Sequence, residues 1–176
     1  MQNINIYQIF TRLYGACSPA KNKVNGSIAD NGVAKFNDFT AEKLQRIKDY
    51  GFSHVWFTGV LEHATQTDYS KFGIRQDHPW IVKGKAGSPY AIKDYFDVDP
   101  DLAEDVSQRM AEFEALVART HKAGLKFVLD FVPNHVARGY GSDVIPEGFE
   151  DLGAEDDDEI SFSTHNNYYY CWGEPL

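Results

Sequence analysis

One stretch of the sequence decides the fold: Lys126-Phe127-Val128-Leu129-Asp130-Phe131-Val132-Pro133-Asn134-His135. Asp130 is a lone carboxylate inside an apolar, β-branched and aromatic run, and such a run predicts a parallel strand that is buried on both faces. An unpaired charge there is strongly destabilising, so Asp130 is expected to have a partner or a function. Pro133 cannot donate to a strand ladder and is expected to end the strand. Asn134 and His135 follow at the end where α/β enzymes place their active sites.

The rest of the sequence predicts strands alternating with helices. Further strands are expected at residues 4–10 and 54–58, and helices from an N-cap at Thr40 to Tyr50 and over about 105–123. Together with the strand at 126–132, this order predicts an α/β fold with a parallel sheet and right-handed crossovers.

Both helices have an apolar side. In the first, Leu44, Ile47 and Tyr50 fall on one side, and Gly51 is placed to be the C′ residue. The predicted stripe of the second helix consists of Met110, Phe113, Val117, Thr120 and His121, with Leu116 on its flank. His121 is therefore expected in the core.

The remaining segments are predicted as loops. Residues 15–37 are rich in Gly, Asn and Asp, and residues 61–100 form a long insert of a kind that is usually functional. Residues 138–160 are Gly-rich and then acidic, which is typical of a solvated loop. Residues 166–172 predict a short aromatic strand, with Tyr168–Tyr170 packed in it.

Composition narrows the partners and the compartment. The 176 residues are 43% hydrophobic, enough for one domain or part of a larger one, and the net charge of −9 makes nucleic acid and anionic membranes unfavourable partners. Cys17 and Cys171 have no CxxC spacing, so neither a disulfide framework nor a zinc site is expected. No signal peptide and no membrane-spanning run is recognised, and we expect a cytoplasmic protein.

Several segments resemble the α-amylase family of glycoside hydrolases. Asp130-Phe131-Val132-Pro133-Asn134-His135 is similar to the family's first signature region, which ends the third strand of a (β/α)8 barrel. Similar segments, in the family's order, are residues 6–10 (first strand), 39–57 (first helix and second strand) and 87–95 (the loop leading to the third helix unit). The resemblance implies a partial (β/α)8 TIM barrel, with its first three strand–helix units in residues 1–135. It also implies that an inserted, loop-rich domain begins in residues 136–176.

The resemblance also implies roles for four residues. His135 matches a histidine that hydrogen-bonds the sugar at the bond to be cut, and Tyr90 matches an aromatic residue that stacks under that sugar. Asn134 matches a ligand of structural calcium in the calcium-dependent members. Asp130 matches an aspartate that orients neighbouring groups of the site and is not the nucleophile.

The implied function is that of the N-terminal part of a retaining α-glucan-active enzyme. Its partners would be an oligo- or polysaccharide and the remainder of its own barrel. Retaining chemistry needs two carboxylates about 5–5.5 Å apart, and in this family they follow later strands, beyond Leu176. We therefore expect no hydrolysis by these 176 residues alone. Asp77, in Gly73-Ile74-Arg75-Gln76-Asp77-His78, imitates the surroundings of the family nucleophile, but it follows no predicted strand and is expected to be an ordinary surface charge.

Two other function classes remain open. A carbohydrate-binding or transporter-associated relative of the same fold would lack the catalytic acids even when complete. A small doubly wound nucleotide-binding domain would have a Gly-rich turn after the first strand, where Thr11-Arg12-Leu13-Tyr14-Gly15 stands instead.

The histidines other than His135 show no metal-binding spacing and are expected to be structural or at the surface. The identity of the α-glucoside, and hydrolysis as opposed to transfer, stay open.

Overall fold

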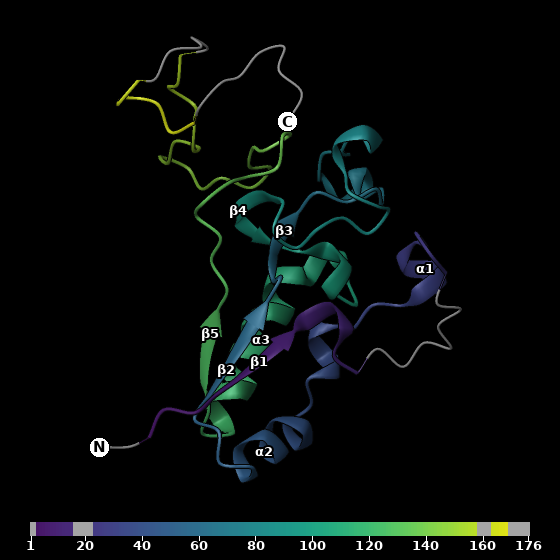
Figure 1. Ribbon diagram of the computed structural model, residues 1–176, viewed down its shortest axis with the longest axis vertical. Coiled ribbons are helices and arrows are strands. Elements are labelled where there is room, and N and C mark those ends of the chain that lie inside the picture. Colours follow the sequence, from purple (N-terminus) through teal and green to yellow (C-terminus); the bar gives the residue numbers. More distant parts are fainter. Residues whose placement is uncertain (1–2, 16–22, 158–162, 169–176) are drawn as a thin grey trace. The chain divides into compact units, whose positions relative to one another are not determined.

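The computed structural model describes residues 3–15, 23–157 and 163–168, and Figure 1 shows its elements. The chain divides into two compact units, Met1–Asp143 and Val144–Leu176. The domain boundary expected after residue 135 stays a prediction.

Three parallel strands form the sheet of the first unit. β1 (Ile6–Phe10) pairs with β2 (His54–Thr58), and β2 pairs with β5 (Lys126–Leu129). The three predicted strands are thus present in the expected parallel arrangement, and all of their carboxyl ends lie at one edge of the sheet (Figure 1). Among the described residues β1 and β5 each have one neighbouring strand, so the sheet does not close into a barrel.

Helix α2 (Ala41–Asp49) begins and ends where the sequence predicts. The Thr40 side chain accepts a hydrogen bond from the Lys43 amide, and Gly51 has φ +90°, a conformation that suits glycine at C′. Leu44 is buried as predicted, and so is Ile47. Tyr50 is not: its side chain is 82% exposed and lines a surface hollow of about 420 Å³.

Helix α3 (Arg109–Lys122) packs against β5, α2 and β4 (Ile92–Val98). Leu116 and Thr120 are fully buried and define its core face, whereas Met110 is exposed. The predicted stripe is therefore displaced, because Leu116 is its centre and not its flank. The prediction that His121 belongs to the core is wrong. His121 follows Thr120 by about 100° around the helix, which turns its side chain to the surface.

Aromatic rings fill the core between the sheet and the helices. Phe57 of β2 stacks on Phe127 of β5 at 4.4 Å between ring centroids and meets Phe39 edge-on at 5.3 Å. Phe36 and Phe39 have no exposed surface although they lie in or next to the region predicted as a polar loop. That region also contains α1 (Ile28–Asn31). Short 3-10 helices occupy Thr11–Leu13, Phe36–Asp38, Ser70–Phe72, Pro79–Ile81, Pro100–Leu102 and Val106–Gln108.

The insert at residues 61–100 is more regular than predicted. It contains an antiparallel pair, β3 (Leu61–His63) and β4 (Ile92–Val98), with a register shift between them. Charged residues of these strands are buried, so their hydropathy does not follow the alternation that marks a strand. The prediction of a long loop is therefore wrong for the two ends of the insert.

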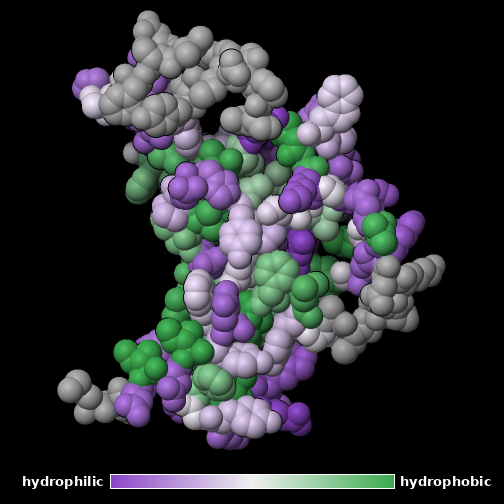
Figure 2. All heavy atoms as spheres, viewed as in Figure 1, coloured by the Kyte–Doolittle hydropathy of each residue, from purple (hydrophilic) through white to green (hydrophobic). Residues whose placement is uncertain are grey.

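β5 is shorter and more exposed than predicted. It ends at Leu129, although the Asp130 amide still donates to the carbonyl oxygen of Phe57 at 3.1 Å. Leu129 and Phe131 are exposed, and hydrophobic surface is visible along the β5 side of the first unit (Figure 2). Burial on both faces needs a strand neighbour on each side, and β5 is an edge strand among the described residues.

The described residues of the second unit, 144–157 and 163–168, contain turns but no helix or strand. The predicted loop is thus confirmed through residue 157. Residues 166–168 do not form the predicted strand, and residues 169–172 lie outside the described residues. Within the described ranges, no helix combines the length and the apolar character that crossing a membrane requires.

Candidate functional site

The carboxyl edge of the parallel sheet gathers three segments. Arg12, in the 3-10 helix that follows β1, donates to the carbonyl oxygens of Ala86 and Gly87, both at 3.1 Å. Gly59, directly after β2, has φ +77°, and a Cβ there would lie 2.7 Å from the side chain of Pro89. The loop that precedes β4 is therefore seated on the ends of β1 and β2, at the edge where α/β proteins build binding sites.

Asp130 is half-buried at the end of β5 and has a defined partner. The indole Nε1 of Trp56 donates to its Oδ1 at 3.0 Å. A partner was expected, and it is a neutral donor on the neighbouring strand. The role of Asp130 in orienting other groups stays a prediction.

Asn134 and His135 are both exposed and lie side by side. The amide Nδ2 of Asn134 is 3.2 Å from Nδ1 of His135. With the amide nitrogen as donor, Nδ1 accepts and the ring proton resides on Nε2. That tautomer leaves Nε2–H available as a hydrogen-bond donor at the carboxyl edge.

β4 holds the segment on both sides of His135. The Tyr95 hydroxyl donates to the Val132 carbonyl at 2.5 Å, and the Ala137 amide donates to the Ile92 carbonyl at 2.7 Å. The Tyr95 ring also packs against Phe131, at 5.4 Å between centroids. A strand absent from the sequence-based prediction thus supports the signature segment.

Tyr90 lies on the loop seated over β1 and β2, and its side chain is 46% exposed. Its amide donates to the Ser88 hydroxyl at 3.4 Å. Among the described residues no hydrogen bond or ring contact joins Tyr90 to His135. Stacking of Tyr90 under a sugar stays a prediction.

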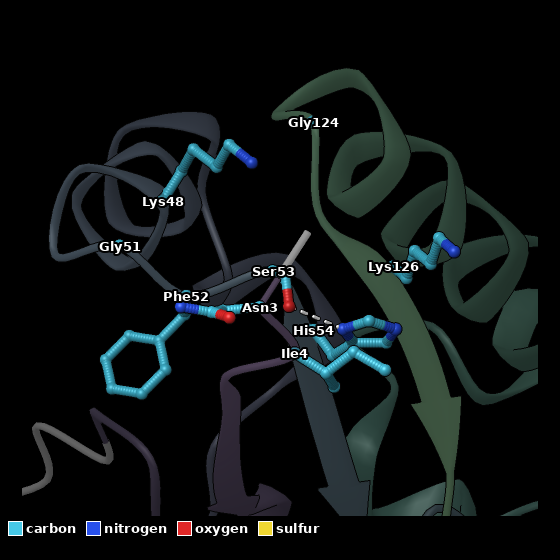
Figure 3. Close-up of a pocket in the computed structure, with 9 residues that line it drawn as sticks. All are labelled: Asn3, Ile4, Lys48, Gly51, Phe52, Ser53, His54, Gly124 and Lys126. Carbon is cyan, nitrogen blue, oxygen red and sulfur yellow. Dashed lines mark hydrogen bonds between the residues drawn. The ribbon is translucent and has the colours of Figure 1, made fainter. Parts of the chain in front are cut away.

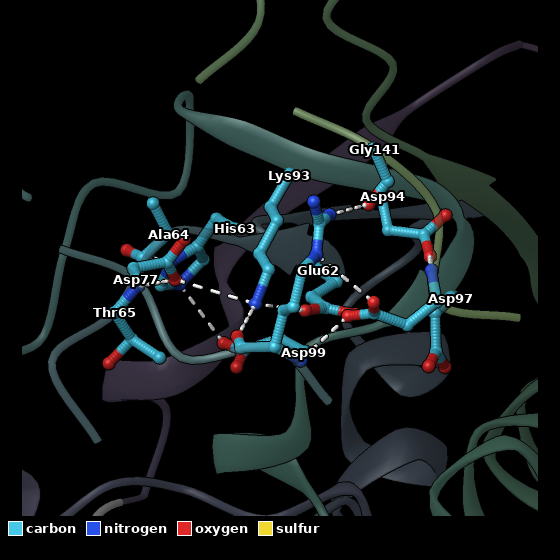
Figure 4. A network of polar contacts seen from close by, with 12 residues as sticks. Glu62, His63, Ala64, Thr65, Asp77, Lys93, Asp94, Asp97, Asp99 and Gly141 are labelled. Atoms are coloured by element: carbon cyan, nitrogen blue, oxygen red, sulfur yellow. Dashed lines mark hydrogen bonds and ion pairs between the residues drawn. The ribbon is translucent and has the colours of Figure 1, made fainter. Parts of the chain in front are cut away.

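A network of buried polar residues, which the sequence analysis did not predict, connects β3, β4 and the loop between them (Figure 4). Lys93 of β4 is 2% exposed, and its Nζ lies 3.3 Å from Glu62 Oε1 and 3.6 Å from Asp77 Oδ2. Asp77 also accepts from the Thr65 amide at 3.0 Å. Asp77 is buried, so its interpretation as a surface charge is wrong: it is a partner of a buried lysine.

Glu62 is the least compensated member of this network. Its Oε2 has no hydrogen-bond partner among the described residues. Burial raises the pKa of Glu62 to about 7, against the opposing effect of Lys93, and the carboxylates of Asp97 and Asp94 raise it further.

A second buried cluster includes His63. Its Nε2 lies 3.1 Å from Asp99 Oδ2, and its Nδ1 lies 3.2 Å from the Ala64 carbonyl oxygen. Burial alone lowers the pKa of His63, but Asp99 outweighs it and the pKa is raised, since both ring nitrogens face acceptors. Tyr69 donates to Asp101 at 2.5 Å. Burial and the charge of Asp99 raise the pKa of Asp101 to about 6. The density of aspartates in residues 94–101 is the sequence signal that could have indicated this cluster.

The opposite, amino edge of the sheet holds a surface cavity of about 540 Å³ (Figure 3). Lys48 and Lys126 lie at its rim near Gly51 and Gly124, which follow the carboxyl ends of α2 and α3. Cations are favoured at such helix ends, so the lysines have a structural explanation. This is also the edge that serves stability in α/β barrels, and we do not place the site here.

The described residues do not by themselves form a metal centre. No group of three or more His, Cys, Asp or Glu side chains among them is arranged to hold an ion. Asn134 offers one amide oxygen, and calcium takes 6–8 oxygen ligands. These residues alone do not fit a calcium site, and a calcium role for Asn134 stays a prediction.

Comparison with known proteins agrees with this geometry. Residues 36–170 match the family model "Alpha amylase, catalytic domain". Maltase A1 of Drosophila melanogaster is 29% identical over 131 residues, which cover 74% of this chain and 16% of that protein. An amino acid transporter heavy chain of Rattus norvegicus is 42% identical over 48 residues, covering 27% of this chain and 6% of that protein.

Among solved structures, an alpha-amylase from Lactobacillus plantarum superposes with a TM-score of 0.50 at 29% identity, over 79% of this chain and 24% of that chain. The chain thus spans a small part of the length of its relatives. The predicted fold, a part of the (β/α)8 barrel, is confirmed by this neighbour and by the parallel order β1-β2-β5. The family model matches well over half of the sequence, including β2, α3, β5 and the Asp130–His135 segment, and on this basis the chain belongs to the alpha-amylase catalytic-domain family.

Proposed function

We propose that this chain supplies sugar-binding residues to a retaining α-glucan-active glycosidase or transglycosidase. The observation that carries the proposal is His135, which stands exposed after β5 at the carboxyl edge of the sheet, within the part that matches the family model. Its Nε2–H is oriented by Asn134 through Nδ1 and can donate to a sugar hydroxyl.

The other proposed roles follow from position. Tyr90 would stack on the sugar ring, since its exposed side chain sits on the loop over β1 and β2. Asp130, held by Trp56, would keep the end of β5 in place. Asn134 would supply one oxygen to calcium, with the other ligands coming from residues outside the described set. The edges of β1 and β5 would pair with further strands of the same barrel.

The chemistry divides between binding and bond cleavage. Retention requires a nucleophilic carboxylate and an acid/base carboxylate about 5–5.5 Å apart. We propose that neither is among these 176 residues, because the segments that resemble the family do not include those that carry these two acids. The contribution of this chain is then to bind and orient the glucan.

The test compares the complete protein that contains this chain with its His135→Ala variant. With maltooligosaccharides as substrates, kcat/KM is expected to fall about tenfold or more, because one lost hydrogen bond in a desolvated site is worth roughly 1–2 kcal/mol. His121→Ala, an exposed histidine on α3, is the matched control and should retain activity. An unchanged kcat/KM for His135→Ala would contradict the sugar-binding role. Turnover by the purified 176-residue chain would contradict the proposed absence of the catalytic acids.

A second candidate is a non-catalytic relative of the same fold. The 42% identity to a transporter heavy chain over 48 residues favours it. This candidate predicts that the complete protein shows no turnover of any α-glucoside. A nucleotide-binding function has no support, because β1 is followed by the 3-10 helix Thr11–Leu13 and not by a Gly-rich turn.

A further inference from the structure

We propose that Arg75 and Lys93 are positioning residues for His135: together they fasten residues 137–143 to β4 and so fix the backbone on which His135 stands. The inference rests on the proposed function, because it assigns a purpose to the position of His135.

The backbone around His135 is a short bridge between two attachments. Before it, the Val132 carbonyl accepts from Tyr95, and after it the Ala137 amide donates to Ile92. His135 itself is exposed, so packing of its own side chain does not determine where it lies. Its position depends on how firmly the two attachments hold.

Arg75 strengthens the second attachment. Its Nη2 donates to the Gly141 carbonyl at 2.5 Å, its Nε donates to Asp143 Oδ1 at 3.1 Å, and its backbone amide donates to Asp143 Oδ2 at 2.8 Å. The planar guanidinium thus grips two points of the segment at once, a geometry that a lysine cannot reproduce. The Asp143 amide is held separately by Asp94 of β4, at 3.0 Å.

Lys93 connects Arg75 and residues 137–143 to the buried polar network. Its Nζ donates to the carbonyl oxygen of Arg75, and its own carbonyl accepts from the Gly141 amide at 3.0 Å. The buried ammonium is held in turn by Glu62 and Asp77 (Figure 4). One residue of β4 therefore contacts both the arginine and the segment that the arginine grips.

The exposure of Arg75 allows a positioning role to be distinguished from a contribution to the global stability of the protein. The Arg75 side chain is 54% exposed, and ion pairs at that exposure add little to global stability. Its removal should therefore loosen residues 137–143 without unfolding the protein. A purely structural role would instead lower the melting temperature and leave the affinity of the folded protein unchanged.

The experiment uses the complete protein and three variants: Arg75→Ala, Arg75→Lys and, as a matched control, Lys83→Ala, an exposed lysine of the same insert. For Arg75→Ala we expect KM for maltoheptaose to rise about three- to tenfold, with a smaller change in kcat and a melting temperature near that of the wild type. Arg75→Lys should recover part of the loss, and Lys83→Ala should match the wild type. A wild-type KM for Arg75→Ala would overturn the proposal.

Amide hydrogen exchange gives a readout that needs no sugar. The amides of Ala137, Gly141 and Asp143 should exchange faster in Arg75→Ala, while those of β1 should not. Lys93→Met combined with Glu62→Gln and Asp77→Asn removes the lysine together with both of its buried carboxylate partners and should have the same local effect. Unchanged exchange at all three amides would overturn the proposal. Absence of any glucan binding or turnover by the wild type would instead contradict the proposed function, and the exchange result would still decide the positioning.

Discussion

Trp56 in β2 donates its indole N–H to the carboxylate of Asp130 across 3.0 Å, from one parallel strand to the end of the next. Trp56 is in register with Val128, and Asp130 stands two residues further along, on the same side of the sheet. A neutral donor therefore compensates part of the cost of taking this carboxylate out of water. The signature aspartate is held by the strand before it, which ties the ends of β2 and β5 together.

Trp56→Phe should destabilise the protein through this hydrogen bond. The change keeps an aromatic ring and removes the N–H, and we expect the free energy of unfolding to fall by about 1–2 kcal/mol in urea titrations. A double-mutant cycle with Asp130→Ala isolates the pair, because alanine removes the acceptor. A coupling energy of zero would show that the contact does not contribute.

Glu62 should give stability an unusual dependence on pH. Burial raises its pKa to about 7 in the folded protein, opposed by Lys93 and reinforced by Asp97 and Asp94, from an ordinary value of 4.5. Between these two values the folded state keeps a proton that the unfolded state has lost, so this contribution to stability falls as pH rises and is constant above pH 7. Glu62→Gln cannot lose that proton.

The Glu62→Gln variant should therefore be more stable than the wild type above pH 7, by up to about 3 kcal/mol, and nearly equal to it at pH 4. Urea unfolding at a series of pH values measures the difference. Glu114→Gln on the exposed side of α3 is the control, and its difference from the wild type should not depend on pH in this way. A Glu62→Gln difference that is flat between pH 4 and 8 would contradict the assigned titration.

Arg109 should be far more important to stability than an exposed arginine. Its Nε and Nη2 grip the buried carboxylate of Asp97 at 2.5–2.9 Å. Arg109→Ala leaves that carboxylate buried without a cation and should cost about 3–5 kcal/mol. Arg46→Ala, which removes an exposed pair with Glu42, should cost less than about 0.5 kcal/mol. Similar losses of stability for Arg109→Ala and Arg46→Ala in thermal or urea unfolding would contradict the expected difference between the buried and the exposed ion pair.

The elements that the sequence predicts well are those whose apolar pattern and caps agree. Thr40 and Gly51 mark the ends of α2, and the run at His54–Thr58 predicts β2 with its observed bounds. β4 could not be recognised in the same way. Its interior positions are filled by charged residues that are buried together with partners outside the strand: Lys93 pairs with Glu62 and Asp77, and Asp97 pairs with Arg109. Asp94 is buried with hydrogen bonds from the amides of Phe96 and Asp143.

The same limit applies to the site. The signature segment predicts that His135 and Asn134 follow a strand, and they do. The residues that hold the segment are Tyr95, Arg75 and Lys93, and nothing local in the sequence distinguishes them from surface residues. Pairings across 18 to 68 positions become visible only when the chain is folded. The exposure of Leu129 has a similar origin, because an apolar run predicts burial but not which neighbours provide it.

Gly87 should be the least replaceable glycine of the loop that carries Tyr90. It has φ +71°, and a Cβ there would lie 1.8 Å from the carbonyl oxygen of Ala64. Gly73 has a similar φ of +81° and nothing within 4 Å of the same position, so it is a matched control.

Gly73→Ala should cost about 1 kcal/mol, the strain of an L-residue in the left-handed region. Gly87→Ala must also move the backbone, and this should lower the free energy of unfolding, measured in urea, by about 1–3 kcal/mol more than Gly73→Ala does. Because Arg12 donates to the carbonyl of Gly87, the shift should reach the end of β1 and weaken glucan binding through Tyr90 in the complete protein. Equal losses of stability for the two alanine variants would show that the loop moves away from the new Cβ at no cost in the free energy of unfolding.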